Sequence, residues 1–217
     1  MPQSYSPVYF PQDWSAVSMS AANQFEDSCT DDAENNVGNY CTWSSIDKNS
    51  NVSLSLGNTL AEQDSASSFK SLFATQAIPV TGKWVWETKL GGGDPFGGWL
   101  AVGISSHNIL TSAGRSGTGM VMFDYRDDGI NSIRIFNQTT SDSVFQAVSF
   151  SNGEAFQFLV DSDAEELQLY VNGSKQGSTV DISGLDKPYK IMGTIYSGGT
   201  ADCTLVTNSA DFENSIG

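Results

Sequence analysis

The sequence predicts an all-β fold, an antiparallel β-sandwich preceded by a mostly irregular N-terminal arm. Short segments in which apolar and polar residues alternate are spread over most of the chain, with turn-forming residues about every ten positions between them. No long apolar period of the helical kind occurs after residue 40. The 217 residues suit one large all-β domain with an appendage, and an apolar fraction of 39% is enough for a core.

The first 38 residues differ in kind from the rest of the chain. Three prolines interrupt regular structure early, at Pro2, Pro7 and Pro11. Aromatic residues are irregularly spaced along the same segment, at Tyr5, Tyr9, Phe10 and Trp14. The one helical candidate, residues 15–26, is marginal by itself because isolated short helices are unstable in water. We therefore expect residues 1–38 to form an arm that packs on its own domain or attaches to a partner, and residues 39–217 to form the sandwich.

Twelve strands are expected in the sandwich, each a short alternating run between turn signals: residues 52–56, 59–62, 68–74, 83–90, 99–105, 119–125, 132–137, 143–148, 155–161, 166–171, 190–196 and 202–206. The clearest is 83–90, where Trp84 and Trp86 fall on one face and Glu87 falls on the other. This pattern is typical of a strand with one face in a core.

Several motifs follow one another in a characteristic order. The strand at 166–171 leads into Asn172-Gly173, the dipeptide that most strongly favours a tight hairpin turn. The motifs are GKWVWE at 82–87, GWLAVGI at 98–104, LYVNG at 169–173, and Gly184-Leu185 with Pro188. Together they resemble the SPRY (B30.2-like) domain, whose fold is a bent, concanavalin-like antiparallel β-sandwich. The resemblance covers residues 41–207, most of the chain.

The first residues of the predicted sandwich indicate which kind of SPRY-like domain the chain resembles. NYCTWSSIDK at residues 39–48, followed by NVSLSLGNTLAEQ, is more similar to the SPRY-like domains of bacteriophage structural proteins than to those of animal ubiquitin ligases. The chain departs from the family in a long turn at residues 91–95 and in an ending, TNSADFENSIG, that lacks an aromatic closing strand. The resemblance implies a location in a virion. Such virion proteins are usually symmetric oligomers, often trimers, so it also implies a homo-oligomer.

Charge and hydropathy exclude two classes of partner. The chain has 10 lysine and arginine residues and 25 acidic residues. Its formal net charge of −15 repels both nucleic-acid backbones and anionic lipids. Apolar runs are far shorter than the roughly 20 residues that a helix needs to cross a bilayer. The N-terminal residues have neither a basic region nor an apolar region of the signal-peptide kind. We expect no nucleic-acid partner, no membrane insertion, and synthesis in a host cytoplasm without a signal peptide.

Catalytic residues are not expected. The one histidine of the chain, His107, leaves no partner for a histidine-based triad or a multi-histidine metal site. Concanavalin-like glycoside hydrolases use paired acids, for which the nearest candidate is Asp161, Asp163 and Glu165. These acids sit between two alternating strands, where a solvated turn is the better interpretation. Glu87 stands alone on its strand, on the face opposite Trp84 and Trp86.

No cofactor or metal site is expected either. The acidic stretch with Asp31, Asp32, Glu34, Asn35 and Asn36 supplies oxygen ligands, but it lacks the glycine and the closing glutamate of an EF-hand loop. The glycines at 91–93 connect two strands and enter no helix, so they form no phosphate loop. Cys29, Cys41 and Cys203 are odd in number and lack a paired spacing, so free thiols are expected. If one disulfide forms, Cys41 with Cys203 is the pair to test.

The remaining kind of function is recognition of a ligand through surface loops. In SPRY-like domains the binding surface is made by loops at one end of the sandwich, and the resemblance implies the same here. The binding candidates lie in the three longest loops: Asp94, Pro95, Phe96, His107, Arg115, Arg126, Asp127 and Asp128. Phe96, beside Pro95 on a glycine-flanked loop, is a candidate for an exposed apolar anchor, although it could equally pack under its own loop.

Two functional hypotheses from different classes follow. In the first, the chain is a non-enzymatic virion structural protein, a fibre, tail or capsid-decoration component. Its arm would bind other virion proteins, and its SPRY-like domain would face outward toward a host surface protein or glycan. In the second, it is a carbohydrate-binding or glycan-active concanavalin-like protein. A cellular SPRY adaptor for peptides is a weaker third possibility, since no companion domain fits in the remaining 40 residues.

Overall fold

The described part of the chain is an all-β sandwich, as the sequence predicts. The computed structural model describes residues 41–63, 69–91, 98–106, 114, 116–126, 132–138, 143–147, 153–197, 201–207 and 212–213. Within these ranges there are no helices. The strands are β1 (Trp43–Lys48), β2 (Ser53–Ser55), β3 (Leu60–Gln63), β4 (Lys70–Ile78), β5 (Lys83–Gly91), β6 (Gly98–Ser105), β7 (Met120–Arg126), β8 (Ser132–Asn137), β9 (Ser143–Ala147), β10 (Ala155–Asp161), β11 (Glu166–Val171), β12 (Ser174–Asp181), β13 (Tyr189–Ser197) and β14 (Ala201–Val206).

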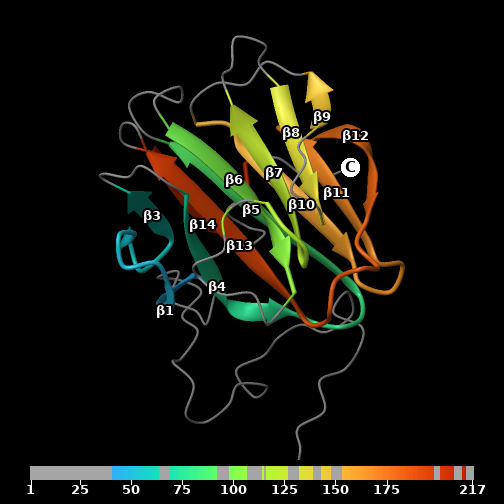
Figure 1. Ribbon diagram of the computed structural model, residues 1–217, viewed down its shortest axis with the longest axis horizontal. Coiled ribbons are helices and arrows are strands. Elements are labelled where there is room, and N and C mark those ends of the chain that lie inside the picture. The colour runs from blue at the N-terminus through green and yellow to red at the C-terminus, as the bar shows by residue number, and fades with distance from the viewer. Residues whose placement is uncertain are drawn as a thin grey trace, which may run out of the picture. The chain divides into compact units, whose positions relative to one another are not determined.

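The strands form two antiparallel sheets (Figure 1). The first sheet has the order β1-β4-β13-β6-β7-β8-β9, and the second has the order β12-β11-β10-β5-β14-β3-β2. Half of the neighbouring pairs join strands that are not consecutive in sequence, as in a sandwich whose chain crosses from one sheet to the other. β5 and β6, which carry the first two motifs, therefore lie in different sheets. β5 is central in the second sheet, and β6 is central in the first.

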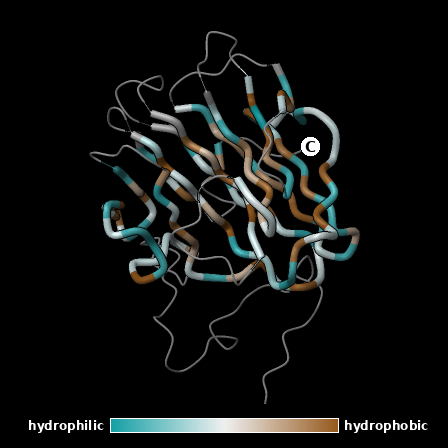
Figure 2. Tube along the Cα trace, viewed as in Figure 1, coloured by the Kyte–Doolittle hydropathy of each residue, from teal (hydrophilic) through white to brown (hydrophobic). Residues whose placement is uncertain are grey.

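The core lies between the inner faces of the two sheets. Figure 2 shows apolar and polar residues alternating along many of the strands, as expected when one face of each sheet is buried. On β5, Trp86 is buried and stacks on Phe158 of β10, with ring centroids 4.9 Å apart. Phe158 in turn meets Phe123 of the first sheet at 5.8 Å. Trp43 also joins the sheets, because its indole Nε1 donates a hydrogen bond of 3.2 Å to the carbonyl of Cys203.

Two strands, β1 and β12, were not predicted. Both are edge strands, and neither alternates cleanly. β1 buries the consecutive residues Trp43 and Ser44, and its register with β4 shifts along its length. β12 is polar and exposed except near Val180, and its pairing with β11 contains a bulge. These two strands are defined by backbone hydrogen bonds to a neighbouring strand. They could not be predicted from side-chain hydropathy because that pattern reports burial and not backbone pairing.

The short connections give the sandwich two distinct ends. β4 passes to β5 through residues 79–82, and β10 passes to β11 through residues 162–165. Because Lys83 at the start of β5 pairs with Asp161 at the end of β10, these turns share one end, here named the turn end. β5 leaves the opposite end at Gly91, which pairs with Asp202 near the start of β14. This opposite end is named the loop end.

Candidate functional site

Several connections between strands leave from the loop end, beside the tight Asn172-Gly173 turn between β11 and β12. They join β3 to β4, β5 to β6, β7 to β8, β9 to β10 and β13 to β14, spanning residues 64–69, 92–97, 127–131, 148–154 and 198–200. The antiparallel registers place them together. Gly98 at the start of β6 pairs with Ser197 at the end of β13, and Arg126 at the end of β7 pairs with Ser132 at the start of β8. The loop end therefore brings several connections together, as a recognition surface made of loops requires.

The connections that contain the predicted binding residues start from both ends of the sandwich. Asp94, Pro95 and Phe96 belong to the 92–97 connection, and Asp127 and Asp128 to the 127–131 connection; these five lie outside the described residues. Both connections nonetheless start and finish at the loop end, as the flanking strands show. Arg126 is the last residue of β7, so its backbone is placed at the loop end.

His107 and Arg115 belong to a different connection, the one between β6 and β7. They also lie outside the described residues, but the β6–β7 connection that contains them starts at the turn end. There the Ser106 N–H donates to the Gly119 carbonyl at 2.8 Å, and the Ser106 hydroxyl accepts a hydrogen bond from the Asp186 N–H at 2.9 Å. The predicted set therefore spans connections that start from both ends, and the binding role of its residues stays a prediction. The attachment candidates Tyr5, Tyr9, Phe10 and Trp14, with the boundary after residue 38, lie outside the described residues as well.

Polar contacts cross-link the turn end. Asp161 Oδ1 accepts hydrogen bonds from the N–H groups of Asp163 and Ala164, at 3.1 and 3.0 Å, which closes the β10–β11 turn. The same carboxylate forms an ion pair of 3.1 Å with Lys83. The hydrogen bond from Ala164 and the nearby Lys83 ammonium lower the pKa of Asp161. Asp163 Oδ2 accepts a hydrogen bond from the Gly82 N–H at 3.0 Å, which ties the two turns together.

Lys187 extends this network to a third connection. Its ammonium donates to the carbonyl of Ser162 at 2.6 Å and pairs with the Glu165 carboxylate at 2.8 Å. The Ser162 hydroxyl donates to the Pro79 carbonyl at 2.9 Å. The acids at 161, 163 and 165 therefore form a turn, as predicted, and each also fixes a neighbouring segment. With its turns joined in this way, the turn end is suited to support the sandwich rather than to adapt to a ligand.

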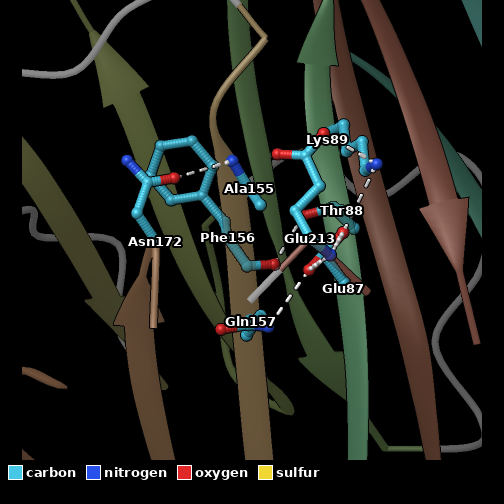
Figure 3. Close-up of polar contacts among 8 residues, drawn as sticks. All are labelled: Glu87, Thr88, Lys89, Ala155, Phe156, Gln157, Asn172 and Glu213. Atoms are coloured by element: carbon cyan, nitrogen blue, oxygen red, sulfur yellow. Dashed lines mark hydrogen bonds and ion pairs between the residues drawn. The ribbon is translucent and has the colours of Figure 1, made fainter. Parts of the chain in front are cut away.

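A buried carboxylate lies on the outer face of the second sheet, where the alternation along the strand does not indicate burial. Glu87 has no exposed surface. Its Oε2 accepts a hydrogen bond of 3.1 Å from Gln157 Nε2 on β10, and both carboxylate oxygens lie within 3.4 Å of the Glu213 N–H (Figure 3). Burial away from water raises the pKa of Glu87. The nearby Lys89 ammonium and the hydrogen bonds to the carboxylate lower this pKa, but by less than burial raises it.

This acid cluster does not meet the needs of glycoside hydrolysis. Glu87 and Glu213 both contact the Lys89 ammonium, at 3.7 and 2.8 Å, so two carboxylates do approach each other. A glycosidase pair must flank a bond of the sugar with both carboxylates accessible. Glu87 is covered, and N–H donors already occupy its oxygens. The cluster is better suited to hold the 212–213 segment on the sheet.

The described residues offer no other arrangement typical of a catalytic or metal centre. No group of three or more histidine, cysteine, aspartate or glutamate side chains within them could hold a metal ion. Cys41 and Cys203 are both free thiols, and burial raises the pKa of the Cys203 thiol. A helix of the length and apolarity needed to cross a membrane does not occur in this part of the chain.

Comparison with known proteins identifies the fold. No family model matches the sequence, and no curated protein matches it either. Solved structures do match. The SPRY domain of human HERC1 is 14% identical, with a TM-score of 0.61 over 77% of this chain and 98% of that one. The TRIM65 PSpry domain is 14% identical, with a TM-score of 0.56 over 76% of this chain and 90% of that one.

Two further structures agree with these. A human SPRY domain is 12% identical, with a TM-score of 0.56 over 73% of this chain and 96% of that one. Stonustoxin is 15% identical, with a TM-score of 0.56 over 76% of this chain and 27% of that one. At these identities the likeness concerns the course of the backbone. The sandwich in the described part of the chain has a SPRY-like fold.

Proposed function

We propose that the chain is a non-enzymatic structural protein of a bacteriophage virion, a fibre, tail or capsid-decoration component that presents a SPRY-like recognition domain. The domain binds a protein through the loop end, with a host surface protein as the expected ligand. Residues 1–38 attach the domain to other virion proteins and hold several copies together.

The observation that carries the proposal is the difference between the two ends of the sandwich. The turn end is cross-linked by the contacts of Asp161, Asp163 and Lys187. The loop end carries several connections between strands of the packed sandwich. Binding residues are most often found on loops that a rigid scaffold positions. The assignment to a phage rests on the opening of the sandwich at residues 39–48, and the predicted arm supports it.

A pair of matched substitutions tests the use of the loop end. Peptides selected from a displayed random library for binding to the full-length protein are expected to lose about fivefold or more in affinity when Arg126 is replaced by alanine. Lys83→Ala is the control. It also removes one positive charge, but at the turn end, and Lys83 is 71% exposed. We expect it to leave the affinity unchanged because an exposed ion pair contributes little. Affinities can be measured by biolayer interferometry.

Two outcomes would count against this proposal. If Lys83→Ala weakens the selected peptides as much as Arg126→Ala does, binding is not restricted to the loop end. If the protein binds no peptide but binds defined members of a glycan array, the carbohydrate-binding alternative replaces protein recognition. Circular dichroism of both variants, which must match the parent protein, separates a loss of binding from a loss of fold.

A further inference from the structure

Two aromatic side chains lie against each other at the loop end, on the outer face of the first sheet. Phe69 directly precedes β4 and Tyr196 lies near the end of β13, and their ring centroids are 5.2 Å apart. The residue before Tyr196, Ile195, is buried in the main core, so Tyr196 belongs to the opposite face of its strand. Both rings are only half-buried. The pair is therefore partly accessible beside the connections that leave the loop end.

The strand register adds a third aromatic residue at the same level of the sheet. Tyr196 of β13 is opposite Trp99 of β6. The next strand of the sheet, β7, ends at the loop end with Arg126. We name Phe69, Tyr196 and Trp99 the aromatic row. Tyrosine and tryptophan are enriched among the residues that dominate binding at protein interfaces, so the composition of the row suits an anchor site.

Two buried hydroxyl groups near the aromatic row have no hydrogen-bond partner among the described residues. Thr194 is two positions before Tyr196 on β13, and Ser132 is opposite Arg126 at the start of β8. Neither residue has exposed surface, and both hydroxyl oxygens are unpartnered. Because buried hydroxyl groups normally form a hydrogen bond, we expect a group that is not among the described residues to complete them.

The charges of the connections at the loop end indicate the kind of partner. Residues 64–69, 92–97, 127–131, 148–154 and 198–200 contain neither lysine nor arginine, but they contain five acidic residues: Asp64, Asp94, Asp127, Asp128 and Glu154. At the strand ends that these connections join, the charged residues are Lys70 and Arg126. Acidic groups therefore outnumber basic groups at the loop end, which favours the approach of a positively charged ligand.

We propose that the loop end binds a basic segment of the partner protein, with an aromatic or aliphatic side chain of that segment packed on the aromatic row. Lysine or arginine residues next to this side chain lie beside the acidic connections. The inference rests on the proposed use of the loop end for protein binding, and it names the chemistry of the ligand. Arg126 can still donate hydrogen bonds to main-chain carbonyl groups of such a segment.

Peptides selected from a displayed random library on the full-length protein test this inference. We expect the selected peptides to be enriched in lysine or arginine next to an aromatic residue or leucine, relative to the unselected library. Tyr196→Ala should weaken the tightest peptide about tenfold or more. Tyr170→Ala is the matched control and should leave the affinity unchanged, because Tyr170 is also half-buried but lies on β11, on the outer face of the second sheet.

A double-mutant cycle separates a direct contact from an indirect effect. Removing the aromatic or leucine side chain of the peptide should cost little further affinity once Tyr196 has been truncated to alanine. Fully additive losses would mean that the aromatic row does not touch this side chain, and they would overturn the inference.

Two other results would overturn the inference and leave the proposed function standing. One is a set of peptides that needs Arg126 but is not enriched in basic residues. The other is a Tyr196→Ala variant that binds the peptides as tightly as Tyr170→Ala does. An equal loss of affinity in Lys83→Ala and Arg126→Ala would instead contradict the proposed function itself.

Photo-crosslinking of the parent protein needs no variant. A selected peptide whose aromatic or leucine residue is replaced by p-benzoylphenylalanine should label the segments that contain Phe69 or Tyr196, as identified by mass spectrometry. Labels confined to the outer face of the second sheet, around Tyr170, would contradict the inference even if Tyr196→Ala fails to fold.

Discussion

Replacing Trp86 with alanine is expected to destabilise the sandwich by about 3 to 5 kcal/mol. Trp86 is buried at the centre of the second sheet and stacks on Phe158 at 4.9 Å. Phe158 contacts Phe123 of the first sheet, so these three rings connect the two layers. Removing the indole leaves a cavity that rigid β-strands on both sides cannot easily close.

Urea unfolding followed by circular dichroism measures this loss. Val85→Ala is the control, because Val85 is the adjacent residue of β5 and lies half-buried on the outer face of the sheet. Its truncation should cost well under half as much, since less apolar surface returns to water. Equal losses for the two variants would mean that the inner face of β5 does not face the main core.

Gly103→Ala is expected to have an effect of similar or larger size, above about 3 kcal/mol, and to reduce the yield of folded protein. Gly103 lies on β6 between Met192 of β13 and Met122 of β7. A Cβ at this position would collide with the carbonyl oxygen of Val121 and lie 3.0 Å from the Met122 Cα. These are backbone atoms of the neighbouring strand, so the strands themselves would have to separate. The glycine of the GWLAVGI motif is thus required by close backbone approach.

Gly114→Ala provides the matched control for this substitution. A Cβ added at Gly114 meets no atom of the described residues within 4 Å, and we expect stability to change by less than about 0.5 kcal/mol. Thermal unfolding of the two variants beside the parent protein is sufficient. If Gly103→Ala unfolds at the same temperature as the parent, the register of β6 with β7 described above is wrong.

Much of the fold could be predicted from the sequence because its central strands alternate strongly. Residues 155–161 and 166–171 were predicted with the same bounds as β10 and β11, and the Asn172-Gly173 turn joins β11 to β12. The fold class followed from these patterns and from the motifs at 82–87 and 98–104. β12 escaped prediction because backbone hydrogen bonds to β11 hold a polar segment that buries little.

The ends of the sandwich from which the candidate loops leave could not be predicted, for a different physical reason. Alternation identifies strands, but it does not say which strands pair. The sequence therefore grouped His107 and Arg115 with Asp94, Phe96 and Arg126, although strand order sends their connections to opposite ends. The burial of Glu87 was missed for the same kind of reason. A residue more than one hundred positions away donates its N–H to the Glu87 carboxylate, and nothing on the strand of Glu87 indicates this contact.

The most direct test of the proposed assembly role is the mass in solution, measured by light scattering, of the full-length protein and of the same protein without residues 1–38. We predict that the full-length protein is an oligomer and that the truncated protein is a folded monomer. That result would make the arm the assembly element and the sandwich a self-contained recognition domain. The same monomeric mass for both proteins, or a truncated protein that no longer folds, would contradict a virion component assembled through its N-terminal arm.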